Sequence, residues 1–391
     1  MQPKGVFSVL IEINHSKIKE TNRKKIMALL LEKNEITKLS ISRLLDISIT
    51  TVSNNISELK NEGIVEDVRT LESTGGRKAI AVKLNENCRY SVGVALTAKH
   101  VKMSLVNLKK NIVESIRVRH GNNGIENIVA LVQEKLDELM KKNNISSQNL
   151  LGVAFSLPGT VDFTEGIIKY SYLLGAKNFN LRGKFEYLNV PIYVDNEANL
   201  SAYYEFINRK DMLKNLLYIS ITDGLGLGII INGKIYRGDN NSSGELGHIK
   251  IALEGKECKC GAKGCLEAYT SMNSLIENYN EVSNIFINDI EEFEDKYNQK
   301  DKVAENALDK YINILSLGIS NLIMILDPNS IFIGGDINSL LKHKLEHLKK
   351  NIYKDNLFTD ESSCSISIAN FKESYLLGAA MMPIEEFLEI N

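Results

Sequence analysis

Long apolar runs are absent from this chain. No stretch approaches the roughly 20 consecutive apolar residues that a helix needs to cross a bilayer. Charged residues also interrupt the short apolar run near the N-terminus, which is therefore a poor match to a signal peptide. A membrane is thus not an expected partner, and the cytoplasm is the expected location.

Cysteine is scarce, with 5 residues in the chain. A secreted disulfide framework would scatter an even number of cysteines through a short chain, and this pattern is missing. Three of the five crowd together as Cys258, Cys260 and Cys265, which in a protein expected in the cytoplasm indicates a metal site. Cys88 and Cys364 stand apart and are expected to be small buried apolar side chains.

Net charge is small, at −2, but it is unevenly spread. Residues 1–83 carry 14 Lys and Arg against 10 Asp and Glu, whereas the rest of the chain carries 33 against 39. A positive segment on a negative body is compatible with a polyanion partner at one end. With 43% hydrophobic and 25% charged residues, the 391-residue chain has the composition of a soluble globular protein of two or three domains.

Residues 1–83 have the pattern of a helix-turn-helix followed by a two-stranded wing. A first helix is expected after a cap at Thr21 or Asn22, and a third between Ser48 and Gly63, with a short helix and a turn between them. The third helix would lie in the DNA major groove, where side chains near its N-terminus meet base edges. A helical protein-interaction module is the alternative. The residues expected to contact DNA are Ser48, Thr50, Thr51, Ser53, Asn54, Asn55 and, in the wing loop, Arg77.

Residues 84–391 alternate strands and helices. An order of several strands, a helix, a strand and another helix occurs twice, which predicts two related α/β halves around a cleft. The expected fold class is therefore α/β, with a winged helix-turn-helix domain over 1–83 and a two-lobed body over 84–391. The loop near residues 70–78 is the natural hinge between them.

The cysteine cluster has the ligands and spacing of a zinc site. Cys258, Cys260 and Cys265 offer three thiolates, and His248 is the obvious fourth ligand. Four protein ligands leave no open position for an activated water, so the zinc is expected to be structural. Buried thiols without a metal are the alternative interpretation.

The segment from Glu245 to Glu267 resembles the signature of the ROK family, which groups repressors, open-reading-frame products and sugar kinases. Further motifs of the body fit the same family, namely FSLPGTVD at 155–162, VDNEAN at 194–199, DGLGLG at 223–228, LDPNSIFIGGD at 326–336 and LLGAA at 376–380. The resemblance implies an actin-like ATPase fold of two RNase-H-like halves. By the family pattern, the sugar-binding residues would be Asn196, Glu197, Glu245, His248 and Glu267. His248 would place one ring nitrogen on zinc and the other toward a sugar hydroxyl.

Three departures from the kinase pattern of this family predict that the body is not an enzyme. Glu197 stands where a kinase has its aspartate base. Residues 95–99 lack the aspartate and the glycine pair of the first phosphate loop, whose backbone must approach phosphates closely. Asp223 replaces the threonine of the second loop and would repel a triphosphate.

The sequence therefore predicts a sugar-responsive repressor that binds a pseudo-palindromic operator as a homodimer or a dimer of dimers. The motif Asn196-Glu197-Ala198-Asn199, together with the wing loop, resembles the xylose repressors of low-GC Gram-positive bacteria. This resemblance implies xylose as the first candidate ligand and glucose as the second. Two alternatives stay open, namely an ATP-dependent sugar kinase that also binds DNA and a metal sensor whose zinc is regulatory.

Overall fold

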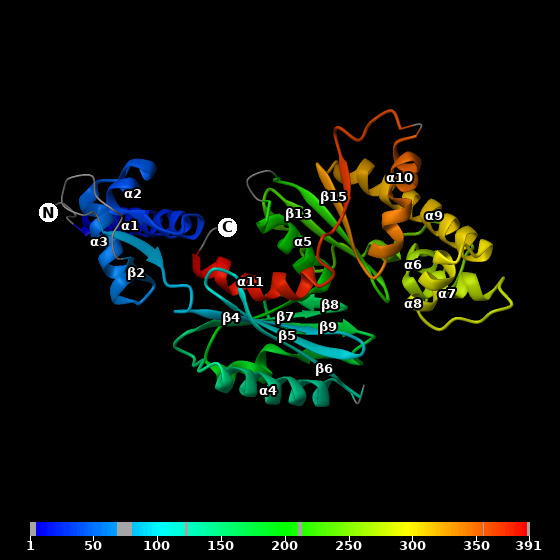
Figure 1. Cartoon of the computed structure of the whole chain (residues 1–391), viewed down its shortest axis with the longest axis horizontal. Helices are drawn as coiled ribbons and strands as arrows, with labels where there is room; N and C mark the ends of the chain where they lie inside the picture. Colours follow the sequence, from blue (N-terminus) through cyan, green and yellow to red (C-terminus); the bar gives the residue numbers. More distant parts are fainter. Residues whose placement is uncertain (1–4, 69–79, 122–123, 210–212, 355, 389–391) are drawn as a thin grey trace.

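The computed structural model describes residues 5–68, 80–121, 124–209, 213–354 and 356–388, with only the backbone described for 5–18. Figure 1 shows three parts, with a small helical domain beside the first of two α/β lobes and the second lobe at the far side. The wing loop with Arg77 and the expected hinge at residues 70–78 lie outside the described residues.

The small domain is a helix-turn-helix with a wing, as expected. Thr37 begins α2 by accepting a hydrogen bond from the Ser40 amide, and Ser48 begins α3 in the same way from Thr51. The expected helix start near Thr21 is wrong, since the first helix already begins at Gly5. Its sheet has the order β1-β3-β2. The elements are α1 (Gly5–Glu32), β1 (Ile36–Thr37), α2 (Lys38–Leu45), α3 (Ile49–Asn61), β2 (Val65–Val68) and β3 (Ala81–Leu84).

The first lobe is built on a five-stranded sheet of order β11-β7-β4-β5-β6. Three strands form an antiparallel meander, and two more extend the sheet in parallel from β4. A small antiparallel sheet of order β10-β9-β8 covers one end. The elements are β4 (Tyr90–Leu96), β5 (His100–Asn107), β6 (Ile112–Arg119), α4 (Ile125–Lys142), β7 (Leu150–Leu157), β8 (Thr160–Asp162), β9 (Ile167–Ser171), β10 (Ala176–Asn180), the 3-10 helix η1 (Arg182–Leu188) and β11 (Ile192–Asn196).

The second lobe repeats this topology, with a sheet of order β14-β13-β12-β15-β16 in which the meander again carries two parallel strands. The expectation of two related halves is therefore confirmed. The elements that follow β11 along the chain are α5 (Glu197–Ile207), β12 (Leu216–Ile221), β13 (Leu225–Ile231), β14 (Lys234–Ile235), the 3-10 helix η2 (Leu246–His248), α6 (Glu267–Thr270), α7 (Met272–Asn280), α8 (Ile290–Asn298), α9 (Lys302–Leu326), β15 (Ser330–Gly335), α10 (Asn338–Tyr353), β16 (Ser365–Ile368) and α11 (Ser374–Leu388).

Helix α9 is long and apolar enough to cross a membrane by length and composition, and it is the one such helix among the described residues. One face of this helix, which includes Leu308, Ile312 and Leu315, is fully buried in the core of the second lobe, whereas Leu317, Met324 and Ile325 are exposed. This burial is what a core helix of a globular protein shows.

Helices α5 and α11 lie between the two lobes and pack closely on each other. Helix α5 covers strands β12 and β13 of the second lobe, whereas α11 covers β4 and β7 of the first. Gly378 allows this approach, because a Cβ at that position would lie 2.0 Å from the Leu200 carbonyl oxygen. The two helices therefore join the sheets of both lobes.

The last turns of α11 reach the small domain, as Figure 1 shows for the red helix beside α1. Ala380, Ile384 and Leu388 share one buried apolar cluster with residues of α1, α2 and α3. Val106 and Leu108 of the first lobe belong to the same cluster. The small domain is thus packed on the body through a continuous core.

We expect Gly378→Ala to destabilise the protein by about 1–3 kcal/mol, because the added methyl group would overlap the Leu200 carbonyl. Glu386→Ala, at an exposed position of the same helix, should change the free energy of unfolding by less than about 0.5 kcal/mol. Urea titrations of both variants measure this difference. Equal stabilities would show that the two helices have room to separate.

Candidate sugar and metal site

A pocket of about 410 Å³ lies between the two lobes and brings together all five residues expected to bind sugar. Residues of the first lobe and of α5 line one side, and residues around η2 and α6 line the other. This volume falls in the range of small-molecule sites in proteins. The five residues are Asn196, Glu197, Glu245, His248 and Glu267.

Asn196 and Glu197 stand at the start of α5. Asn196 caps the helix, since its Oδ1 accepts from the Ala198 amide at 2.8 Å, and its Nδ2 donates to the Gly159 carbonyl at 2.9 Å. The hydroxyls of Ser220 and Thr222 donate to Oε1 of Glu197 at 3.4 and 3.2 Å. Burial raises the pKa of Glu197 to about 7, against the lowering effect of Thr222 and with a further rise from the negative charge of Asp223.

Glu245 and Glu267 approach the pocket from the second lobe. Oε2 of Glu267 accepts from the Leu225 amide at 3.0 Å, and a Cβ at Gly224 would lie 2.9 Å from that same oxygen. The missing side chain at position 224 therefore lets the carboxylate rest against the β12–β13 turn. Oε1 of Glu245 accepts from the Thr160 hydroxyl of the first lobe at 3.2 Å. The pocket thus offers several carboxylate oxygens, which can accept hydrogen bonds from the adjacent hydroxyls of a sugar.

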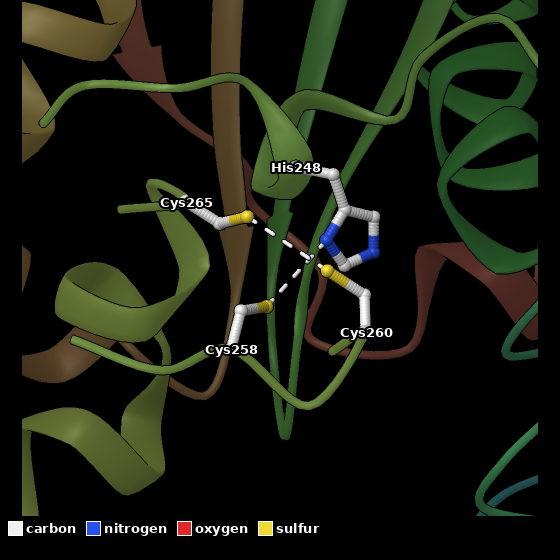
Figure 2. A group of neighbouring side chains, drawn as sticks. All are labelled: His248, Cys258, Cys260 and Cys265. Carbon is white, nitrogen blue, oxygen red and sulfur yellow. Dashed lines mark hydrogen bonds between the residues drawn. The ribbon is translucent and has the colours of Figure 1, made fainter. Parts of the chain in front are cut away.

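The four expected metal ligands form one group beside this pocket. Figure 2 shows the side chains of His248, Cys258, Cys260 and Cys265 pointing toward one another. Their ligand atoms all lie within 4.8 Å of one another. Nδ1 of His248 is 3.7 Å from Sγ of Cys258, and Sγ of Cys260 is 3.8 Å from Sγ of Cys265. The group could hold a metal ion.

These separations fit a tetrahedral ion. With zinc–sulfur bonds of about 2.3 Å, two thiolates on a tetrahedron stand roughly 3.8 Å apart. The loop favours the thiolate form of Cys260, because the Ala262 amide donates a hydrogen bond to it and lowers its pKa. Burial raises the pKa of Cys258 to about 12, so its thiolate needs a neighbouring cation.

His248 belongs to both the metal group and the pocket. Its Nδ1 faces the cysteines, whereas its Nε2 is 3.9 Å from Oε2 of Glu245. The residue also lines the pocket. A ligand at Nδ1 would fix the ring orientation and leave the Nε2 proton facing the pocket.

The two segments compared with kinase phosphate loops form tight turns. Thr97 closes the β4–β5 turn, where its hydroxyl donates to the His100 carbonyl at 3.0 Å. Asp223 lies in the β12–β13 turn and lines the pocket with Gly224. The structure therefore places a carboxylate at the edge of the pocket in the second turn.

The expected DNA-contacting residues gather at the N-terminal half of α3. Ser48, Thr50 and Asn54 are exposed, and Thr51 and Ser53 are partly exposed. Asn55 differs from the expectation, since it is 2% exposed and its Nδ2 donates to the Thr51 carbonyl at 2.9 Å. Asn55 faces the core because it follows Val52 by one helical turn, and it is removed from the DNA-contacting set.

Sequence reasoning missed several residues of the site. Thr160 and Thr222 hold carboxylates of the pocket, and Arg237 forms an ion pair with Asp195 beside it. Thr160 and Asp195 lie within the motifs at 155–162 and 194–199, but their partners are 85 and 42 residues away. No local spacing could have indicated these pairs.

Known proteins similar to this chain match both of its parts. A model described as the ROK family matches residues 91–385, and a model described as winged helix-turn-helix DNA-binding matches residues 19–66. The chain is 29% identical to a putative xylose repressor of a Caldicellulosiruptor species, over 96% of this chain and 98% of the relative. It is 26% identical to the xylose repressor of Bacillus spizizenii, over 95% and 97%.

A crystal structure of a ROK family transcriptional regulator, described as a homologue of the Escherichia coli MLC protein, has the same fold. It superposes with a TM-score of 0.80 at 22% identity and covers 95% of this chain and 96% of that one. The family model spans both lobes, the pocket and the metal group. The chain belongs to the ROK family and carries an N-terminal winged helix-turn-helix domain.

Proposed function

We propose that this protein is a sugar-responsive transcriptional repressor of the cytoplasm. One observation carries the proposal. A pocket lined by all five expected sugar-binding residues lies in a body whose core continues into a winged helix-turn-helix domain. The similarity to xylose repressors along nearly the whole chain supports the same function. Residues 1–83 would bind operator DNA, and residues 84–391 would bind the sugar.

The packing supports a route from the sugar to the DNA. Helix α5 begins with two residues of the pocket and packs along α11, whose last turns lie in the core of the DNA-binding domain. Glu385 of α11 is 1% exposed and forms an ion pair with Lys110 of the first lobe. A sugar that draws the lobes together would move α5 against α11, and α11 would then shift the small domain. Operator and sugar affinities must change reciprocally if this route operates.

The exposed start of α3 is suited to major-groove contacts. Ser48, Thr50, Thr51, Ser53 and Asn54 supply hydroxyl and amide groups that can bond to phosphates or base edges. Arg77 of the wing completes the proposed set. A homodimer, or a dimer of dimers, would present two such helices to the two halves of an operator.

Xylose is the first sugar to test, with glucose as the competing candidate. The relatives that match along the whole chain are xylose repressors, and this similarity supports the choice. A pocket lined with carboxylates also disfavours ligands that lack hydroxyls, because its polar groups would then be left unpaired.

Sugar kinase activity is the second candidate, because Glu197 occupies the position of a catalytic base and a carboxylate with a pKa of about 7 can exchange protons at neutral pH. We nevertheless propose that the protein is not an enzyme. Thr97 and Ala98 place side chains where a phosphate loop needs glycine, and Asp223 adds a negative charge where a triphosphate would bind.

We also propose that the group of His248, Cys258, Cys260 and Cys265 holds a structural zinc ion. Three thiols and an imidazole are a donor set that zinc prefers, and the separations of these atoms fit a tetrahedron. When bound, the metal would act as a fixed support for the His248 side of the pocket. The alternative is a metal sensor with an exchangeable ion.

Saturating xylose is expected to change operator affinity, most simply by weakening it about 5- to 150-fold, and operator DNA should change xylose affinity by the same factor. Calorimetry with a panel of pentoses and hexoses measures sugar binding, and fluorescence anisotropy with operator DNA measures the coupling. Glu267→Gln should weaken sugar binding, whereas Glu277→Gln, on a helix outside the pocket, should leave it unchanged.

Operator affinity that no saturating sugar changes would contradict the repressor proposal. If xylose does not bind but another sugar does, only the choice of sugar is overturned. An assay of ADP release tests the kinase candidate, and robust turnover would replace the repressor-only interpretation.

The raised pKa of Glu197 makes part of the protein's stability dependent on pH. The protonated acid is favoured in the folded state, so this contribution is present below the ordinary value of 4.5 and is lost as pH rises through about 7. The loss should amount to at most about 3 kcal/mol. Glu197→Gln should remove this dependence, whereas Glu245→Gln, at an exposed position of the same pocket, should keep it. Urea titrations between pH 5 and pH 8 measure the difference, and parallel profiles for wild type and Glu197→Gln would contradict it.

Metal analysis of the purified protein should find about one zinc ion per chain, and mild chelation should not remove it without unfolding. Cys258→Ser should lose the zinc and lower the melting temperature. Cys88→Ser, which changes a half-buried cysteine outside the group, should retain the metal. Zinc that exchanges freely and alters operator affinity would favour the metal sensor.

A further inference from the structure

Arg237, in the loop after β14 of the second lobe, is held by residues of the first lobe. Its Nε and Nη2 donate to Oδ2 of Asp195 at 3.1 and 2.6 Å. Asp195 is 2% exposed and ends strand β11 with Asn196. Its other oxygen accepts from the Asn196 amide at 2.8 Å and from Nδ2 of Asn199 at 2.9 Å. The carboxylate is therefore fully paired, as a buried charge requires.

The guanidinium of Arg237 also stacks on an aromatic ring of the first lobe. It lies 3.8 Å from the centroid of Phe163, in the loop after β8. A planar guanidinium can pair with a carboxylate and stack on a ring at once, which a lysine ammonium cannot match. Asp195 and Phe163 thus form a socket in one lobe for a side chain of the other.

Arg237 lies directly behind the proposed sugar site. A cavity of about 40 Å³ is lined by Arg237, Asp195, Asn196 and Glu245, and it shares the last two residues with the larger pocket. This cavity has room for about one or two water molecules. The socket and the pocket therefore have walls in common.

The loop that follows Arg237 leads to Glu245 and is closed by backbone hydrogen bonds. The Ser243 amide donates to the Arg237 carbonyl at 3.1 Å, and the Leu227 amide donates to the Gly244 carbonyl at 3.1 Å. Two further contacts join this loop region to the first lobe, from Lys169 to the Asn240 carbonyl at 3.0 Å and from Thr160 to Glu245 at 3.2 Å. A displacement of Arg237 would move Glu245 with it.

We propose that Arg237 is a positioning residue that pins the two lobes together behind the sugar and sets the separation between Asn196 and Glu245. The inference rests on the proposed sugar site. Asp195, which pairs with Arg237, is joined to Asn196 by one peptide bond. The closed loop connects Arg237 to Glu245. When the lobes close, they rotate about the contact between Arg237 and Asp195. The sugar hydroxyls then meet hydrogen-bond acceptors of both lobes at a fixed spacing.

The chain offers a matched control in Arg209. This arginine also pairs with a buried carboxylate, Glu205, which is 1% exposed, and also stacks on a ring, 4.7 Å from the centroid of Phe332. Neither Arg209 nor Glu205 lines the pocket. Arg209→Met therefore removes the same kind of interaction without touching the sugar site.

The test compares Arg237→Met with Arg209→Met in the full-length protein. Both variants should lower the melting temperature. In the sugar-free protein, Arg237→Met alone should speed amide hydrogen exchange over residues 238–245 and 196–199. It should also lower the affinity for the sugar that wild type binds by about 10- to 100-fold, because misplaced contacts lose most of their strength. Phe163→Leu removes only the ring and should shift both readouts in the same direction to a smaller degree, which keeps the test decisive if Arg237→Met does not fold.

If Arg237→Met has the hydrogen exchange and the sugar affinity of wild type, the inference is overturned. It is also overturned if Arg209→Met changes hydrogen exchange and sugar affinity at the pocket as much as Arg237→Met does. If wild type binds none of the sugars, the proposed function fails by itself. The exchange comparison then still decides whether Arg237 pins the lobes, because it is made without sugar.

Discussion

The close packing of α5 on α11 is the contact on which the rest of this structure depends. Each helix covers the sheet of a different lobe, so the two lobes meet through this pair. The contact requires Gly378, since any side chain there would overlap the Leu200 carbonyl. Because packed helices have few alternative arrangements, a change at one end of the pair has to be accommodated at the other. The pocket lies at the start of α5, and the DNA-binding domain lies at the end of α11.

The second constraint is the group of thiols and imidazole beside the pocket. Its four ligands come from one short segment, so the segment can close on an ion without help from the other lobe. His248 extends this local support into the pocket, because its two ring nitrogens face different sides. A metal at this position would hold one wall of the proposed sugar site rigid and leave the opposite wall free to move with the first lobe. Such a division suits a site that must both bind a ligand and change shape.

The two lobes share one topology, and the family includes both kinases and repressors. In this chain the small domain is attached to the body by packing. The apolar cluster that includes Ile26, Ile56 and Ile384 crosses the boundary between them, so the DNA-binding domain is not a freely tethered head. The ion pair between Lys110 of the first lobe and the buried Glu385 adds a second contact between α11 and the body. A domain packed in this way can follow movements of the lobes.

Local patterns were sufficient for much of this protein. The spacing of Cys258, Cys260 and Cys265 fixes which atoms can share an ion, since a short loop leaves their side chains few other directions. The alternation of strands and helices indicated two related lobes, and the ROK resemblance supplied five residues that the structure brings into one pocket. Helix α3 was also predictable, because Ser48 and Gly63 mark its ends by their own chemistry.

Other features were decided by contacts between distant segments. The early start of α1 was missed because cap residues further along the chain suggested another boundary. Asn55 was expected at the surface from its residue type, but it lies one turn after Val52 on the face of α3 that packs on the core, where it is buried. Arg237 and Asp195 join the two lobes although they are 42 residues apart, and no local pattern links the two positions. The sequence by itself therefore determined the donor atoms of the cysteine cluster and the order of the elements, because these depend on neighbouring residues. The tertiary structure alone decided which side chains meet across the cleft and how the small domain is held, because those depend on how whole lobes pack.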